Sequence, residues 1–120
     1  MAGTRARKQG LEAAFETWRQ SWEAIDNDAY LSYYSDDFGS FDRSKEQWDT
    51  YKRRVNDAKS SIQVDVSNLS LFADPGTPEI VSVRFFQRYR SNNYDWDGWK
   101  EQLWRRSDAG RWEIIYEGNG

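Results

Sequence analysis

Residues 79–106 read EIVSVRFFQRYRSNNYDWDGWKEQLWRR, and their pattern is typical of paired β-strands. Apolar and polar residues alternate along much of it, which is the period of two that a half-buried strand requires. Residues 91–93, Ser-Asn-Asn, interrupt the alternation with residues that favour turns. The stretch therefore predicts a hairpin of two strands, from about residue 79 to 90 and from about 94 to 106.

The sequence on either side extends this hairpin into a sheet. In residues 62–67, isoleucine and valine alternate with polar residues and predict an earlier strand. Residues 74–78 contain both prolines of the chain and predict the turn that follows it. Residues 108–110, Asp-Ala-Gly, predict a turn into a last strand at about 111–117. Together these patterns predict an antiparallel meander of about four long strands.

The sequence before the strands has the spacing of helices. Ser44, with Gln47 three residues later, has the pattern of a capping box and predicts a helix start. Asp28 is the predicted N-cap of a short helix before it. The first helix is predicted from five apolar residues at steps of four, three, four and three: Leu11, Phe15, Trp18, Trp22 and Ile25. Three helices followed by four strands predict an α+β fold, with the helices packed on the sheet.

Length and composition limit the function. A chain of 120 residues fits one domain, predicted at 10–120, after a disordered basic tail or expression remnant at 1–9. The absence of cysteine and histidine removes thiolate chemistry and the commonest general base and metal ligand, so we predict no metal and no cofactor. The net charge is −3, so the chain lacks the excess of basic residues that is typical of nucleic-acid-binding proteins, and we predict no nucleic-acid partner. No apolar run approaches the ~20 residues that membrane insertion needs.

Two sets of aromatic residues resemble a known superfamily. The beginning of the chain resembles the opening of NTF2-like domains in the order of Phe15, Trp18, Trp22, Asp28, Tyr30, Tyr34 and Phe38. Later motifs are similar to the Cds6-type NTF2-like domain of bacterial L,D-transpeptidase-like and L,D-carboxypeptidase-like cell-wall proteins. These motifs are Arg43-x4-Trp48-x4-Arg53, Phe86-Gln87-x-Tyr89, Gly98-x-Lys100 and Trp112-x-Ile114-x-Tyr116-Glu117.

The resemblance implies a cone in which helices lie across a curved sheet, with a pocket between them. In the resembled subgroup the domain is an accessory module, and the catalytic cysteine belongs to a separate domain. The resemblance therefore implies binding or pairing in a periplasmic or cell-envelope protein that modifies peptidoglycan, rather than turnover. It also implies a homodimer formed through the sheet.

A pocket is predicted on the face of the sheet that meets the helices. That face is the more apolar one, and burial of the unpaired Gln87, Lys100 or Gln102 there would cost roughly 1–3 kcal/mol each. The predicted ligand-binding residues are Trp22, Tyr34, Trp48, Tyr51, Gln87, Tyr89 and Lys100. Rings with a few polar groups suit a sugar, a peptide or a small hydrophobic ligand. The alternative is that the rings form the core and Lys100 extends to solvent.

No catalytic residue is predicted. The acids of the strand region fall mainly on the outward parity, and only a bulge or a misjudged register would turn one inward. These acids are Asp65, Asp95, Asp97, Glu101, Glu113 and Glu117. The alternative function is a small enzyme of the ketosteroid isomerase or SnoaL-type cyclase class, which would need an acid in the pocket.

The opposite face of the sheet is predicted to form a homodimer interface. Phe86, Trp99, Leu103 and Ile115 fall on this face, on three successive strands. Large apolar groups gathered on a surface usually mark a partner site. The alternative is that neighbouring arginine stems cover these residues.

Overall fold

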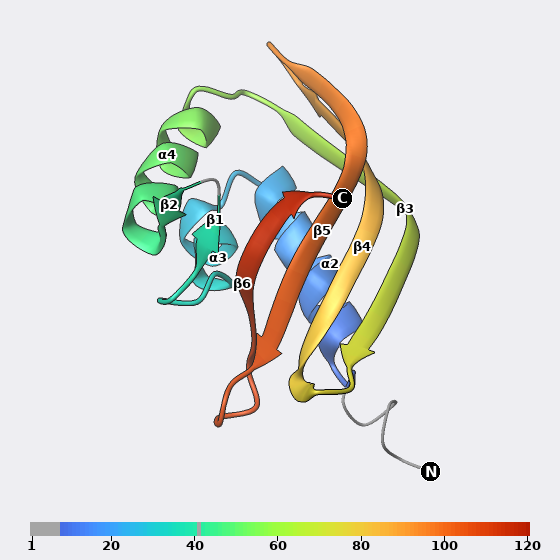
Figure 1. Cartoon of the computed structure of the whole chain (residues 1–120). Helices are drawn as coiled ribbons and strands as arrows, with labels where there is room; N and C mark the ends of the chain where they lie inside the picture. Colours follow the sequence, from blue (N-terminus) through green and yellow to red (C-terminus); the bar gives the residue numbers. More distant parts are fainter. Residues whose placement is uncertain (1–7, 41) are drawn as a thin grey trace.

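Four long strands form one antiparallel sheet in the computed structural model, which describes residues 8–40 and 42–120 (Figure 1). They are β3 (Ile62–Asp74), β4 (Thr77–Ser91), β5 (Asp95–Arg106) and β6 (Trp112–Asn119), paired in that order. The predicted meander and the α+β class are therefore confirmed. The sheet curves around α2 (Leu11–Glu23), which crosses its concave face (Figure 1).

Two further helices lie at one end of the sheet, and both begin at a side-chain cap. In α4 (Lys45–Asp57), Ser44 and Gln47 form the predicted capping box. In α3 (Asn27–Ser32), the N-cap is Asp26, whose side chain accepts a hydrogen bond from the Ala29 amide at 3.2 Å. The prediction of Asp28 as this cap was wrong by two residues. The short strands β1 (Gly39–Ser40) and β2 (Arg43–Ser44) pair between α3 and α4 and were not predicted.

Aromatic rings fill the space between α2 and the sheet. Phe15 meets Phe85 edge to face with the ring centres 5.0 Å apart, and Trp18 lies 5.6 Å from Trp22. Such pairs contribute roughly 0.5–1.5 kcal/mol each beyond the burial of their area. Trp104 of β5 is fully buried on the same side. The aromatic content therefore forms much of the core.

A β-bulge in β6 reverses the direction of its last side chains. Trp104 pairs with Ile114 but Leu103 pairs with Tyr116, so Ile115 is an extra residue in the strand. Beyond the bulge Tyr116 is 38% exposed and Glu117 is 3% exposed. Glu117 was predicted among the acids on the outward parity, and the bulge turns it to the inner face. One extra residue shifts the two-residue period by one step, which turns every later side chain over.

Side chains cover the free edge of β3. The Val64 carbonyl accepts from Arg19 at 2.9 Å, and the Val64 amide donates to Glu23 at 2.8 Å. Lys8 donates to the Leu71 carbonyl at 2.7 Å. Pairing of this kind removes backbone groups from an edge that could recruit another strand.

The predicted tail at 1–9 lies mostly outside the described residues. Of its last two residues, Lys8 reaches β3 and the Gln9 carbonyl accepts from the Trp112 indole at 2.8 Å. Within the described part of the chain, no helix combines the length and the apolar character needed to cross a membrane.

Candidate functional site

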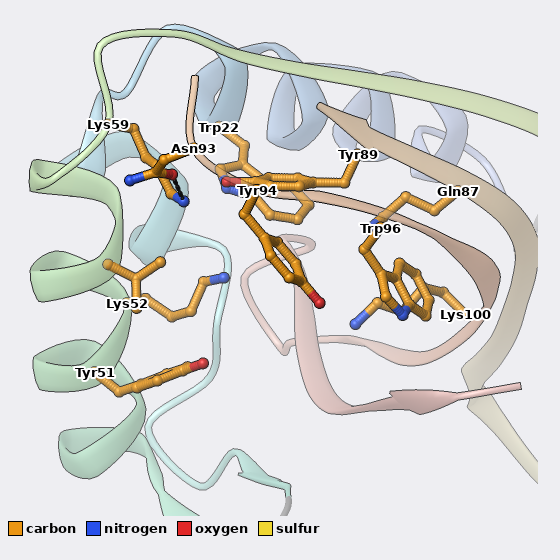
Figure 2. Close-up of a pocket in the computed structure, with 11 residues that line it drawn as sticks. Trp22, Tyr51, Lys52, Lys59, Gln87, Tyr89, Asn93, Tyr94, Trp96 and Lys100 are labelled. Atoms are coloured by element: carbon orange, nitrogen blue, oxygen red, sulfur yellow. Dashed lines mark hydrogen bonds between the residues drawn. The ribbon is translucent and has the colours of Figure 1, made fainter. Parts of the chain in front are cut away.

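An open cavity of about 480 Å³ lies between α4 and the hairpin of β4 and β5 (Figure 2). Its size falls within the roughly 300–1,000 Å³ of small-molecule sites. The residues that line it are Trp22, Tyr51, Lys52, Val55, Lys59, Gln87, Tyr89, Asn93, Tyr94, Trp96 and Lys100. The lining thus combines aromatic rings with three lysines.

Helix α4 supplies one wall through Tyr51, Lys52 and Val55. The Lys52 ammonium lies near three aromatic rings, 4.8 Å from the centre of Trp22, 5.6 Å from Trp48 and 5.8 Å from Tyr30. Loss of water lowers the pKa of Lys52 to about 8, with opposing attraction from Glu117 and further repulsion from neighbouring cations. The faces of these rings attract the cation, but they provide neither a hydrogen-bond acceptor nor a counter-charge for the ammonium group.

The sheet supplies the opposite wall. Gln87 is 2% exposed and Tyr89 is 7% exposed, both on β4. The Trp96 indole crosses the backbone at Gly98, where an added Cβ would lie 2.6 Å from the ring. Glycine at this position therefore allows the indole to lie against the strand and to form the wall beside Lys100, whose ammonium is 5.4 Å from the ring centre.

Glu117 is held on the inner face behind the cavity by three groups. Its Oε1 accepts from the Tyr34 hydroxyl at 2.9 Å and from Gln102 Nε2 at 2.8 Å. Its Oε2 lies 3.6 Å from the Lys100 ammonium. Burial raises the pKa of Tyr34 well above its ordinary value, so its hydroxyl keeps the proton that it donates. The carboxylate is therefore paired and balances the charge of Lys100.

Hydrogen bonds join the end of α4 to the hairpin at the rim of the cavity. Lys59 donates to the Asn93 side chain, as Figure 2 shows. The Asn92 side chain accepts from the Ser60 amide at 2.9 Å. These contacts fix the position of the hairpin tip relative to the helix.

The structure separates the seven predicted ligand-binding residues into two groups. Trp22, Tyr51, Gln87, Tyr89 and Lys100 line the cavity, and Figure 2 shows them around one space. Tyr34 and Trp48 do not line it. They are 2% and 3% exposed, and their ring centres lie 5.5 Å apart in the core, where the Phe38 ring packs 5.0 Å from each of them.

The sequence did not predict six residues of the lining: Lys52, Val55, Lys59, Asn93, Tyr94 and Trp96. The spacing held the missing signal for Lys52, which stands four residues after Trp48 and so shares its helix face.

The predicted interface residues lie on the convex side of the sheet. Phe86 and Trp99 pair across β4 and β5 with ring centres 5.6 Å apart and an angle of 82°. Leu103 is half-buried, as is Ile115 at the bulge. The Arg84 guanidinium lies 5.1 Å from the Trp99 ring centre, yet Trp99 stays 38% exposed. Among the residues that the structure describes, no group of three acidic side chains gathers to hold a metal ion.

Known proteins resemble this chain in sequence and fold. A family model described as the Cds6 C-terminal NTF2-like domain matches residues 10–118. Bd1075 of Bdellovibrio bacteriovorus is similar, with a TM-score of 0.82 and 25% identity, over 94% of this chain and 40% of that one. A variant of the helical cell shape determining protein Pgp2 of Campylobacter jejuni has a TM-score of 0.85 and 23% identity, over 93% and 40%.

Other similar structures include proteins described as enzymes. A proposed dehydratase of the NTF2-like family from Streptomyces avermitilis has a TM-score of 0.77 and 8% identity, over 95% of each chain. No curated protein sequence matches this chain significantly. The chain spans 40% of the length of Bd1075 and of Pgp2.

Proposed function

Because this chain belongs to the family of Cds6 C-terminal NTF2-like domains, we propose that it is a non-catalytic binding module, an accessory domain of a peptidoglycan-modifying protein of the cell envelope. The observation that carries the proposal is the cavity between α4 and the hairpin of β4 and β5, with aromatic walls and a few polar groups. Rings cover the apolar faces of sugars, while amide and ammonium groups fix their orientation. A fragment of the glycan or of its peptide suits such a lining.

The likeness to larger proteins supports an accessory role. This chain corresponds to 40% of Pgp2, a cell shape determining protein, and of Bd1075. Glu117, an inner-face acid 3.6 Å from the Lys100 ammonium of the lining, already accepts from Tyr34 and Gln102. A general base must instead face the proton that it removes.

The first prediction compares two tryptophans of β5 that lie on opposite faces. Trp96→Ala should weaken binding of a purified disaccharide–tetrapeptide of peptidoglycan by about tenfold, because one aromatic wall is lost. Trp99→Ala, on the outer face, should leave the dissociation constant unchanged. Isothermal titration calorimetry gives both constants. Equal effects of the two substitutions, or no binding to the parent chain, would contradict the proposed site.

The alternative function is a small enzyme of the ketosteroid isomerase or SnoaL-type cyclase class, acting on a small hydrophobic substrate. Two observations favour it: the fold is similar to that of a proposed dehydratase, and Glu117 lies on the inner face. Mass spectrometry of a ligand after incubation separates the functions. A binding module returns the ligand unchanged, whereas an enzyme changes its mass or its fragmentation.

We also propose that two copies of this chain pair through the outer face of the sheet. Phe86 and Trp99 form an edge-to-face pair there, and Tyr116, turned outward by the bulge, is 38% exposed. Leu103 pairs with Tyr116 across β5 and β6, so outward apolar residues lie on three adjacent strands, with Arg84 and Glu101 between this pair and the pair of Phe86 and Trp99. A second copy presents the same surface, as a two-fold interface requires.

The second prediction concerns this pairing. Phe86→Glu and Leu103→Glu should each convert a dimer into a monomer in sedimentation velocity at micromolar concentration, because a buried unpaired carboxylate opposes association. Thr17→Glu adds the same charge on the exposed side of α2 and should leave the dimer intact. A parent chain that sediments as a monomer would rule out the pairing.

A further inference from the structure

Three polar groups in the wall of the cavity have no partner among the described residues. The buried indole nitrogen of Trp22 has no acceptor, and the side-chain oxygen of Gln87 has no donor. The Lys52 ammonium has aromatic rings around it but no hydrogen bond or ion pair within the described part of the chain. For the two buried groups, Trp22 Nε1 and Gln87 Oε1, the lack of a partner costs roughly 1–3 kcal/mol each, whereas Lys52 is half-buried. A bound ligand would supply the missing partners.

The other two lysines of the cavity differ from Lys52. Lys100 faces the carboxylate of Glu117 at 3.6 Å, and Lys59 donates to Asn93. No acidic residue of the described chain lines the cavity. Lys52 is therefore the lysine of the lining whose charge lacks a close anionic or neutral acceptor, and it stands beside the Trp22 indole (Figure 2).

We propose that the ligand carries a carboxylate that binds Lys52 and the indole N–H of Trp22, and that a neighbouring N–H or O–H of the ligand donates to Gln87. This inference rests on the proposed binding function and names the chemistry of its ligand. Two donors, one of them charged, match the two oxygens and single charge of a carboxylate. Gln87 then selects a donor close to that carboxylate, which both a sugar acid and a peptide C-terminus can provide.

Two matched pairs of probes test the carboxylate and distinguish its sources. N-acetylmuramic acid differs from N-acetylglucosamine by a lactyl group that carries a carboxylate. D-alanyl-D-alanine differs from its C-terminal amide by the charge of its terminus. In each pair the acid is compared with the neutral molecule, and the pair that shows the preference identifies a sugar acid or a peptide terminus as the source.

At least one acid should bind the parent chain about tenfold more tightly than its neutral analogue at pH 7, in calorimetry at low salt. Lys52→Met should abolish this preference. Lys45→Met is the control, because Lys45 lies on the same helix but pairs with Asp49 at 2.6 Å and is outside the lining.

Two outcomes would overturn the inference in different ways. Equal binding of acid and neutral molecule in both pairs, or a preference that survives Lys52→Met, rejects the carboxylate subsite and leaves the binding function standing. No binding of any of the four probes or of the disaccharide–tetrapeptide rejects the binding function and the subsite together.

Discussion

Replacing Glu117 with alanine is expected to lower the free energy of unfolding by about 3–5 kcal/mol, because it removes one member of a buried charged network. The substitution leaves the Tyr34 hydroxyl and the Gln102 amide without the acceptor that they meet at 2.9 and 2.8 Å. It also leaves Lys100 without its counter-charge at 3.6 Å. Urea unfolding followed by tryptophan fluorescence measures the change.

Two further variants test whether the loss of stability comes from the charge of Glu117 and from its position on the inner face. Glu117→Gln keeps an acceptor for Tyr34 and Gln102 but removes the charge, so its cost should be about half as large. Glu113→Ala, on the same strand before the bulge, removes a half-buried acid of the outer face and should cost less than about 1 kcal/mol. If Glu117→Ala and Glu113→Ala had equal effects, the inward position of Glu117 would be wrong.

The sheet could be predicted from sequence where its period of two is unbroken. Along β4, Val81, Val83 and Phe85 are buried as their alternation required. In β6, Ile114 and Ile115 are both isoleucine, so the pattern gives no sign of which residue the bulge makes extra. The position of Glu117 depends on that bulge, and it became evident only with the pairing of β5 and β6.

The cavity was predictable on the side of the sheet and less so on the side of α4. Gln87 and Lys100 were identified because they are polar residues on an apolar strand face. Lys52 was not predicted in the lining, although its helical spacing from Trp48 places it on the same side of the helix. Packing determines which of the two residues reaches the cavity. The rings of Tyr34 and Phe38 pack against Trp48, whereas Lys52 lines the cavity.

The environment of Lys52 makes the stability of the domain depend on pH. Loss of water is the main cause that lowers its pKa from an ordinary 10.5 to about 8. Glu117 opposes this change, while Lys100, Lys59 and Arg43 add to it. Tyr30 also faces the ammonium, and burial raises the pKa of its hydroxyl, so it stays neutral across this range. Protonation of Lys52 is therefore less favourable in the native state than in the unfolded chain, and the charged lysine destabilises the native state.

Lys52→Met should accordingly raise the free energy of unfolding by about 2 kcal/mol at pH 7. The methionine side chain is uncharged, so it lies among the same aromatic rings without the cost of removing a charge from water. Between pH 8 and 10.5 the unfolded parent holds more protons at this site than the native parent, so the stability of the parent rises with pH. The advantage of the variant should then shrink toward zero by about pH 10. Urea unfolding of both proteins from pH 7 to 10 measures it.

Taking the difference between parent and variant at each pH removes the titration of tyrosines and other lysines, which the two proteins share. Lys45→Met is again the matched control, since its ammonium is paired with Asp49 at 2.6 Å on the same helix. Its difference from the parent should stay constant between pH 7 and 10. A Lys52→Met difference that is equally flat would show that the Lys52 ammonium is hydrated in the native state, and would remove the basis for an unpaired cation in the cavity.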